Sequence, residues 1–358
     1  MSVRESESEN NRRTLVLVIG MHRSGTSTVA GALGILGATM PATGLGLSED
    51  NPKGHFEPKE IVSLHDRVLA SAGMRWWDWD QFPDAWYNTP AAQPFVDELV
   101  GIVQEEFGDA PLFVVKDPRT CKLIPLWRRV GEILNLDIVG VLPFRHPDEV
   151  ARSLHVRDGF PLPNSHMAWL RYMLEAERES RGMRRVFLHY EDLLADERTV
   201  MRRVVDTLQL PLPHQAEADF AALEAFVDPD LRRSRAESGS LNHLHEWLRD
   251  TITAYARGTI QAPDGTAQVP DSDVLDRVHA AFETACGAFV PALAATNKGF
   301  EDAQGRNMLI PGLEADLAMA QDALRLRDER IADLENQLTM AAQKKTAPLG
   351  WLRRRSTD

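Results

Sequence analysis

Apolar residues follow two different patterns along the first 210 residues of the chain. Short apolar runs, which are typical of buried strands, lie at 15–19, 112–115, 138–142 and 185–189. Between these runs, apolar residues recur at helical spacing at 61–72, 95–107, 123–134, 165–181 and 199–208. Strands that alternate with helices predict an α/β fold with a mainly parallel sheet.

The first predicted strand runs into a loop bounded by Gly20 and Gly25, and then into a helix. This arrangement directs backbone N–H groups and a helix N-terminus at an anion. The loop is close to the Walker A pattern, but Thr26 stands in place of the lysine, and the positive charge lies earlier, at Arg23 beside His22. We therefore expect a phosphate-binding loop on a three-layer fold like that of P-loop NTPases. A tight turn without a ligand is the alternative interpretation.

The C-terminal third is predicted to be helical. Helical spacing recurs at 216–226, 244–256 and 274–289, and a heptad pattern follows. Its apolar positions fall seven apart, at Ile310, Leu317, Leu324, Ile331 and Leu338. With Arg327 as a polar interruption, this pattern predicts a coiled-coil helix and a homo-oligomer that forms through it. A helix that folds back against its own chain is the alternative.

These patterns divide the chain into four expected parts. Residues 1–12 are expected to be a disordered tail, 13–300 an α/β domain, 308–342 the coiled-coil helix, and 343–358 a basic tail. The basic tail contains Arg353, Arg354 and Arg355, which are expected either to make a weak contact with acidic membrane lipid or to be solvated.

Composition narrows the class of protein. The formal net charge of −13 argues against non-specific nucleic-acid binding, which depends on the neutralisation of phosphates. Two cysteines in 358 residues fit a reducing compartment. The N-terminus is polar, unlike a signal peptide, and no apolar stretch approaches the length of a membrane-spanning helix. We therefore expect a cytoplasmic protein without a transmembrane segment.

Charged residues follow two of the predicted strands at their carboxyl ends, where ligands bind in α/β folds. Lys116 and Asp117 follow the second strand, and Arg145 follows the third, with Ser153 eight residues further on. The alternatives are structural: Lys116 forms an ion pair with Asp117, and Ser153 hydrogen-bonds within its own helix.

Three segments resemble motifs of the sulfotransferases that use 3′-phosphoadenosine 5′-phosphosulfate (PAPS). The loop Gly20-Met21-His22-Arg23-Ser24-Gly25-Thr26-Ser27 resembles the 5′-phosphosulfate loop. Arg145-His146-Pro147 with Ser153 is similar to the 3′-phosphate motif, and Tyr190-Glu191-Asp192-Leu193 to a third family segment. Order and spacing agree over residues 14–210, and the likeness is greatest to the bacterial branch. The loop arginine and the Lys-Asp-Pro motif are also similar to tyrosylprotein sulfotransferases.

The resemblance implies roles for these residues. The donor would be held by His22, Arg23, Ser24, Gly25, Thr26, Ser27, Arg145, Ser153 and Tyr190, with Tyr190 near the adenine. Arg23 and Lys116 would supply positive charge at the leaving oxygen, and no metal is expected. The basic segment 232–235 either helps to bind nucleotide phosphates or is solvated, and the family's late Arg-Lys-Gly pattern is absent.

The base that accepts the acceptor's proton is expected in the segment after the first helix, as the resemblance implies. Glu57 is the favoured candidate because it lies between Phe56 and Pro58, in a partly apolar setting. His55 is its closest competitor, whereas His65 lies within a predicted helix and is expected to be structural.

The sequence thus predicts transfer of a sulfuryl group from PAPS to a hydroxyl, by family analogy that of a carbohydrate or glycolipid. An aromatic cluster at Trp76–Trp86 either stacks on the sugar or is a packed loop, and packing is the favoured interpretation. Two other functions remain open. One is an ATP-using phosphotransferase, which the missing Walker A lysine disfavours, and the other is a non-catalytic scaffold with a coiled-coil helix.

Overall fold

The computed structural model describes residues 12–46, 53–228, 241–259 and 269–289, together with six helical positions between 321 and 332. The chain divides into two units, Met1–Ala288 and Phe289–Asp358, and the sheet belongs to the first. In the predicted coiled coil, Leu324 and Ile331 are helical and exposed. The pairing of this helix and the expected domain bounds stay predictions. The two tails lie almost wholly outside the described residues.

Four parallel strands form the sheet, in the order β2-β1-β3-β4. They are β1 (Thr14–Val18), β2 (Leu112–Lys116), β3 (Asp137–Phe144) and β4 (Arg184–His189). The predicted α/β fold with a parallel sheet is therefore confirmed. Val18 pairs in register with Lys116 of β2 and with Val141 of β3. The loop after β1 therefore begins beside the carboxyl end of β2, which is the edge where ligands bind in such folds.

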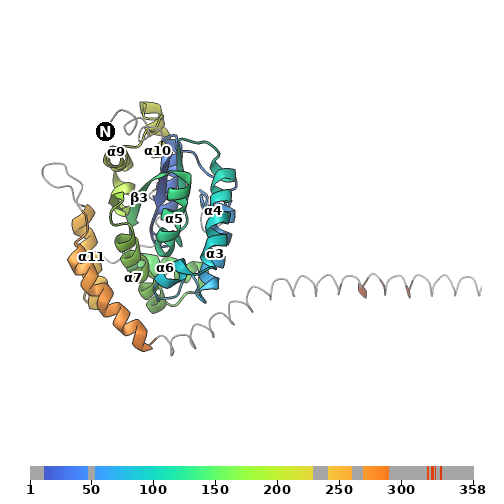
Figure 1. Cartoon of the computed structure of the whole chain (residues 1–358), viewed down its shortest axis with the longest axis vertical. Helices are drawn as coiled ribbons and strands as arrows, with labels where there is room; N and C mark the ends of the chain where they lie inside the picture. Colours follow the sequence, from blue (N-terminus) through green and yellow to red (C-terminus); the bar gives the residue numbers. More distant parts are fainter. Residues whose placement is uncertain are drawn as a thin grey trace, which may run out of the picture. The chain divides into compact units, whose positions relative to one another are not determined.

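Each helix predicted from periodicity in residues 13–289 is present, and two short ones, at Asp84–Asn88 and Tyr190–Ala195, were not predicted (Figure 1). The helices are α2 (Thr26–Ile35), α3 (Lys59–Ser71), α4 (Ala92–Phe107), α5 (Thr120–Leu134), α6 (Pro147–Asp158), α7 (Leu162–Glu179), α8 (Tyr190–Ala195), α9 (Glu197–Leu208), α10 (Glu217–Phe226), α11 (Glu246–Thr259) and a helix at 272–289. A short 3-10 helix, η1, spans Asp84–Asn88. Helix α5 begins at Thr120, three residues before the predicted start. Leu123, where the prediction begins, has a non-helical backbone, and one helical turn precedes it.

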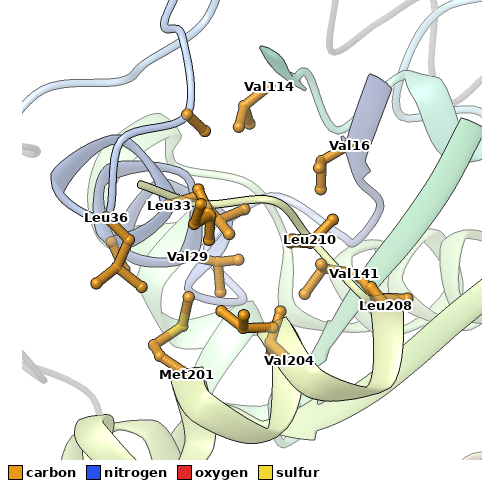
Figure 2. Close-up of a cluster of buried hydrophobic side chains, with 14 of the residues drawn as sticks. Val16, Val29, Leu33, Leu36, Val114, Val141, Met201, Val204, Leu208 and Leu210 are labelled. Carbon is orange, nitrogen blue, oxygen red and sulfur yellow. The ribbon is translucent and has the colours of Figure 1, made fainter. Parts of the chain in front are cut away.

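The two faces of the sheet are covered by different helices. On one face, valines of the strands pack with Val29 and Leu33 of α2 and Met201 of α9 in a fully buried cluster (Figure 2). Residues with the opposite parity, such as Leu15 and Leu17, point to the other face, where α5 contacts β3 and α11 contacts β4. This arrangement gives three layers. Each fully buried side chain of this size contributes about 1.5–3 kcal/mol to folding.

Candidate functional site

The loop between β1 and α2 has the backbone shape of an anion-binding site. Arg23 and Gly25 both have positive φ angles, 67° and 86°. A left-handed conformation is uncommon for a residue with a side chain, and here it turns successive N–H groups toward one side. Helix α2 follows with no side-chain cap at its N-terminus. The N-terminus of a helix is where phosphate groups bind in many proteins, because its N–H groups and the helix dipole favour an anion there.

Gly25 is required at its position for a second reason. A Cβ atom built there would lie 2.2 Å from the ring of Tyr190, far inside contact distance. Tyr190 begins α8, and its ring packs directly on the loop. A side chain at residue 25 would therefore displace the aromatic ring that the resemblance associates with the adenine of the donor.

Two buried polar atoms of the loop have no hydrogen-bond partner among the described residues. They are Nε2 of His22 and Oγ of Ser24, whose residues are 8% and 0% exposed. A buried polar atom left without a partner costs about 1–3 kcal/mol, so native structures usually satisfy it. Unsatisfied atoms in a loop of this shape indicate a ligand that supplies the missing partners.

One group of predicted residues meets on the α6 side of the loop. Nε of Arg23 donates to Oγ of Ser153 at 2.9 Å, and Nη1 of Arg145 donates to the carbonyl oxygen of Arg23 at 2.9 Å. The Arg145 guanidinium also lies over the ring of Tyr190, 5.0 Å from its centroid. Four candidate residues from three separate segments are thus brought together. Arg145 is held in turn by Glu149, at 2.8 Å.

A second group meets at the end of β2. Nζ of Lys116 donates to Oγ of Ser27 at 3.1 Å and to the carbonyl oxygen of His55 at 3.1 Å, and it forms an ion pair with Glu57. Lys116 and Glu57 are 3% and 7% exposed. The partner of Lys116 is therefore Glu57, and not Asp117 as the structural alternative required. The setting of Glu57 is also more polar than its neighbours in the sequence indicate.

His65 forms a buried pair with Asp117, the residue that follows Lys116. Nδ1 of the buried His65 lies 2.7 Å from the Asp117 carboxylate, and its Nε2 accepts a hydrogen bond from Trp127 at 3.2 Å. Both ring nitrogens are occupied, which agrees with the expected structural role of His65. Burial acts to raise the pKa of Asp117, but the charge of Arg119 and the hydrogen bond with His65 outweigh it and lower that pKa.

The aromatic cluster divides into a core part and a loop part. Phe82, Trp86 and Tyr87 are buried, as the packing interpretation predicted. The loop part is held by its backbone: the Tyr172 hydroxyl donates to the Trp76 carbonyl at 2.9 Å, and Nζ of Lys122 donates to the Asp78 carbonyl at 2.6 Å. Our sequence interpretation missed Lys122. A lysine among the apolar residues of a helix start was the available signal.

Three further features considered in the sequence analysis are the basic segment, metal-binding groups and membrane spans. The basic segment 232–235 falls outside the described residues. Within the part that the structure describes, no group of three or more His, Cys, Asp or Glu side chains is arranged to hold a metal ion. No described helix has both the length and the apolar content of a membrane span.

Comparisons with known proteins give three solved structures of interest. A sulfotransferase domain of the Synechococcus olefin synthase is 19% identical, with 71% of this chain and 97% of that chain covered and a TM-score of 0.40. A sulfotransferase from Mycobacterium tuberculosis is 12% identical (62% and 73% covered, TM-score 0.36). A sulfotransferase domain from the curacin biosynthetic pathway is 18% identical (75% and 96% covered, TM-score 0.34). No family model and no curated protein matches the chain.

Proposed function

We propose that this protein is a sulfotransferase that moves a sulfuryl group from PAPS to an acceptor hydroxyl. The observation that supports this function is that one anion-binding loop has a cationic group on each side. Arg23, Arg145 and Ser153 meet on one side, and Lys116, Ser27 and Glu57 meet on the other. A donor with phosphate at both its 3′ and 5′ positions matches two such groups, whereas ATP carries all its phosphates on one chain.

On this proposal the loop N–H groups, with Ser24 and Thr26, bind the 5′-phosphosulfate, and Arg145 with Ser153 binds the 3′-phosphate. The cation–π contact of Arg145 with Tyr190 supports this assignment, because the residues proposed to contact the 3′-phosphate and the adenine are neighbours. Charge-assisted hydrogen bonds to a phosphate are each worth about 1.5–3 kcal/mol. The 3′-phosphate would therefore be the feature by which the site selects its nucleotide.

The second group supplies the chemistry of transfer. The acceptor oxygen forms a bond to sulfur while the bond from sulfur to the 5′-phosphate oxygen breaks, and the acceptor proton passes to the Glu57 carboxylate. Lys116 stabilises the negative charge that develops on the leaving oxygen, a contribution of about 2.7–4 kcal/mol for a well-placed donor. His55 is less suited to be the base, because it joins this group through its carbonyl oxygen.

For the acceptor we propose a carbohydrate or glycolipid hydroxyl. The supporting feature is the loop at 76–80, in which Trp77 and Trp79 are partly exposed and alternate with Asp78 and Asp80. Indole rings beside carboxylates suit a ligand that has both apolar faces and hydroxyl groups. Burial raises the pKa of Asp80, with its largest opposing influence from Arg171.

Calorimetry with 3′,5′-adenosine bisphosphate (PAP), ADP and ATP tests the donor. PAP is expected to bind at least about tenfold more tightly than ADP, since one or more charged hydrogen bonds depend on the 3′-phosphate. Equal affinity for PAP and ADP contradicts the proposal. Tighter binding of ATP than of PAP would instead support a phosphotransferase.

A further inference from the structure

His22 differs from the other residues of the loop in the direction of its contacts. Its imidazole centroid lies 4.5 Å from the Trp76 ring and 5.9 Å from the Tyr172 ring. Neither aromatic residue belongs to the group at Arg145 and Tyr190 that is proposed to bind the nucleotide. The side chain of His22 therefore contacts the loop at 76–80 and Tyr172 of α7.

The chemistry of His22 is that of a neutral group with an unmet hydrogen bond. Burial, followed by the charge of Arg119, lowers the pKa of His22 well below its ordinary value, so the ring is uncharged at neutral pH. Its Nε2 atom is buried and has no partner among the described residues. An uncharged imidazole offers a phosphate one N–H donor and no charge, whereas a hydroxyl, which both donates and accepts, can pair with either of its nitrogens.

The position of the ring is fixed by its surroundings. Trp76 packs on the imidazole and also stacks on Phe160, with ring centroids 5.8 Å apart. The Trp76 backbone is tied to α7 by the Tyr172 hydroxyl, and the next residues are tied through Lys122. These contacts hold the ring in one position, so its unpartnered Nε2 atom is fixed where a ligand can bind it. Such rigidity favours precise placement of a bound atom.

We propose that His22 binds the acceptor rather than the donor: its imidazole forms a hydrogen bond with the hydroxyl that receives the sulfuryl group. This inference rests on the proposed sulfotransferase function and reassigns one residue that the loop motif associates with the nucleotide. His22 orients the attacking oxygen and Glu57 takes its proton, so the two residues have separate tasks. The bond that forms joins this oxygen to sulfur, and the bond that breaks joins sulfur to the 5′-phosphate.

Two variants within the same loop test whether His22 binds the acceptor or the donor. His22→Phe keeps a ring against Trp76 but removes both nitrogens, and Ser24→Ala removes the other unpartnered atom of the loop. PAP affinity is measured by calorimetry. Turnover of PAPS is measured as PAP release with water as the acceptor, because water presents the same O–H group as the natural hydroxyl. His22→Gln, which retains hydrogen-bonding groups, serves as the conservative variant if His22→Phe is poorly folded.

The expected result is a divergence between the two variants. His22→Phe keeps PAP affinity within about twofold of wild type but lowers PAPS turnover about five- to hundredfold, and His22→Gln recovers part of that loss. Ser24→Ala weakens PAP binding about tenfold. The inference is overturned if His22→Phe weakens PAP binding as much as Ser24→Ala does. It is also overturned if His22→Phe leaves PAPS turnover unchanged, or if wild-type protein shows no measurable PAPS hydrolysis. Wild-type protein that fails to prefer PAP over ADP refutes the proposed function itself.

Discussion

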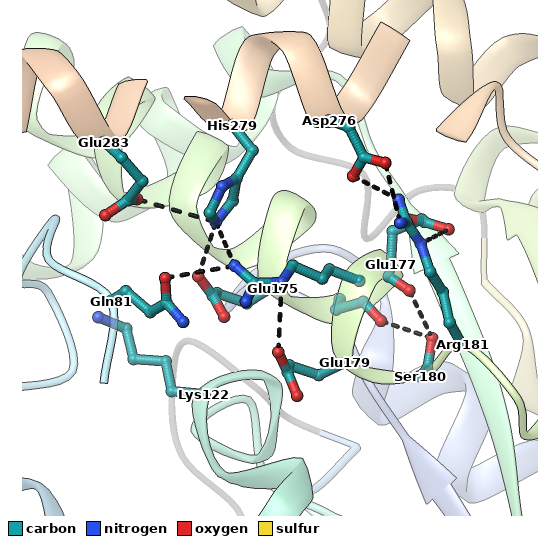
Figure 3. Close-up of polar contacts among 12 residues, drawn as sticks. Gln81, Lys122, Glu175, Glu177, Glu179, Ser180, Arg181, Asp276, His279 and Glu283 are labelled. Atoms are coloured by element: carbon teal, nitrogen blue, oxygen red, sulfur yellow. Dashed lines mark hydrogen bonds and ion pairs between the residues drawn. The ribbon is translucent and has the colours of Figure 1, made fainter. Parts of the chain in front are cut away.

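Two regions of this molecule bury charged side chains in ion pairs, and they differ in the polar groups that surround those pairs. One is the loop after β1 with Lys116 and Glu57, and the other is the contact between α7 and the helix at 272–289 (Figure 3). In the second region, the fully buried Arg171 lies 2.9 Å from Glu175 and also pairs with Glu283. Figure 3 shows two further links in this contact, from His279 to Glu175 and from Asp276 to Arg181.

The carboxylates of the helix contact have more than one partner. Glu177 lies 2.6 Å from Arg181 and 2.9 Å from Arg185, while Arg181 also binds Asp276 at 2.8 Å. The loop, by contrast, leaves His22 and Ser24 with buried atoms that have no described partner. Burial of charge is therefore not what distinguishes a ligand site in this protein. What distinguishes the loop is the combination of two such atoms with a backbone that turns its N–H groups to one side, since single buried atoms without a hydrogen bond also occur elsewhere, for example at Trp77 and Thr251.

The largest effect that would test this comparison is on turnover. Glu57→Gln preserves the shape of the base but removes its basicity, so PAPS turnover is expected to fall about 10²- to 10⁴-fold while PAP affinity persists. Glu175→Gln makes the same chemical change in the helix contact and should leave the turnover of folded enzyme near the wild-type rate. If Glu57→Gln keeps turnover near the wild-type rate while His55→Ala loses turnover, the base is His55 and not Glu57.

The second-largest expected effect is on the free energy of unfolding. Arg171→Met removes one member of the helix contact and leaves the Glu175 carboxylate, 4% exposed, without its closest cation. Loss of one partner of a buried pair costs about 3–5 kcal/mol, so the free energy of unfolding should fall by that amount in urea denaturation. PAP affinity of the folded variant should remain at the wild-type value. A weaker affinity would show that the two regions are energetically coupled.

Selection of the nucleotide should respond to the Arg145 group. Arg145→Ala alone is a poor test, because it leaves Glu149, which is fully buried, without its cation. Arg145→Gln combined with Glu149→Gln avoids the stranded charge, and Ser153→Ala removes the hydroxyl. Each change is expected to reduce the preference for PAP over ADP by about ten- to hundredfold in calorimetry. An unaltered preference would place the 3′-phosphate elsewhere.

Sequence and structure agree where the information is local. The strands, the turn after β1 and the eight-residue interval from Arg145 to Ser153 were predictable because period and spacing determine them. The pairing of Lys116 with Glu57 and the contact of His22 with Trp76 were not. Each joins residues more than 50 positions apart, and no local pattern states which distant segments meet. The early start of α5 was missed because its first turn is buried but partly polar.

The smallest effect concerns Lys122, which lies between the two regions. Burial, followed by the charge of Arg171, lowers the pKa of Lys122 to about 8, whereas an unfolded lysine titrates near 10.4. Between these values the unfolded chain binds more protons than the folded protein, so this residue makes stability increase with pH. The unfolding free energy of wild type relative to Lys122→Met should therefore increase by about 1 kcal/mol from pH 8 to pH 9.

Lys59→Met, a change at an exposed lysine, serves as the control and should show no such trend. Parallel pH profiles for wild type and Lys122→Met would mean that Lys122 is better solvated than its contacts with the Asp78 and Asp80 carbonyls indicate, and that the loop at 76–80 is held less firmly against α5.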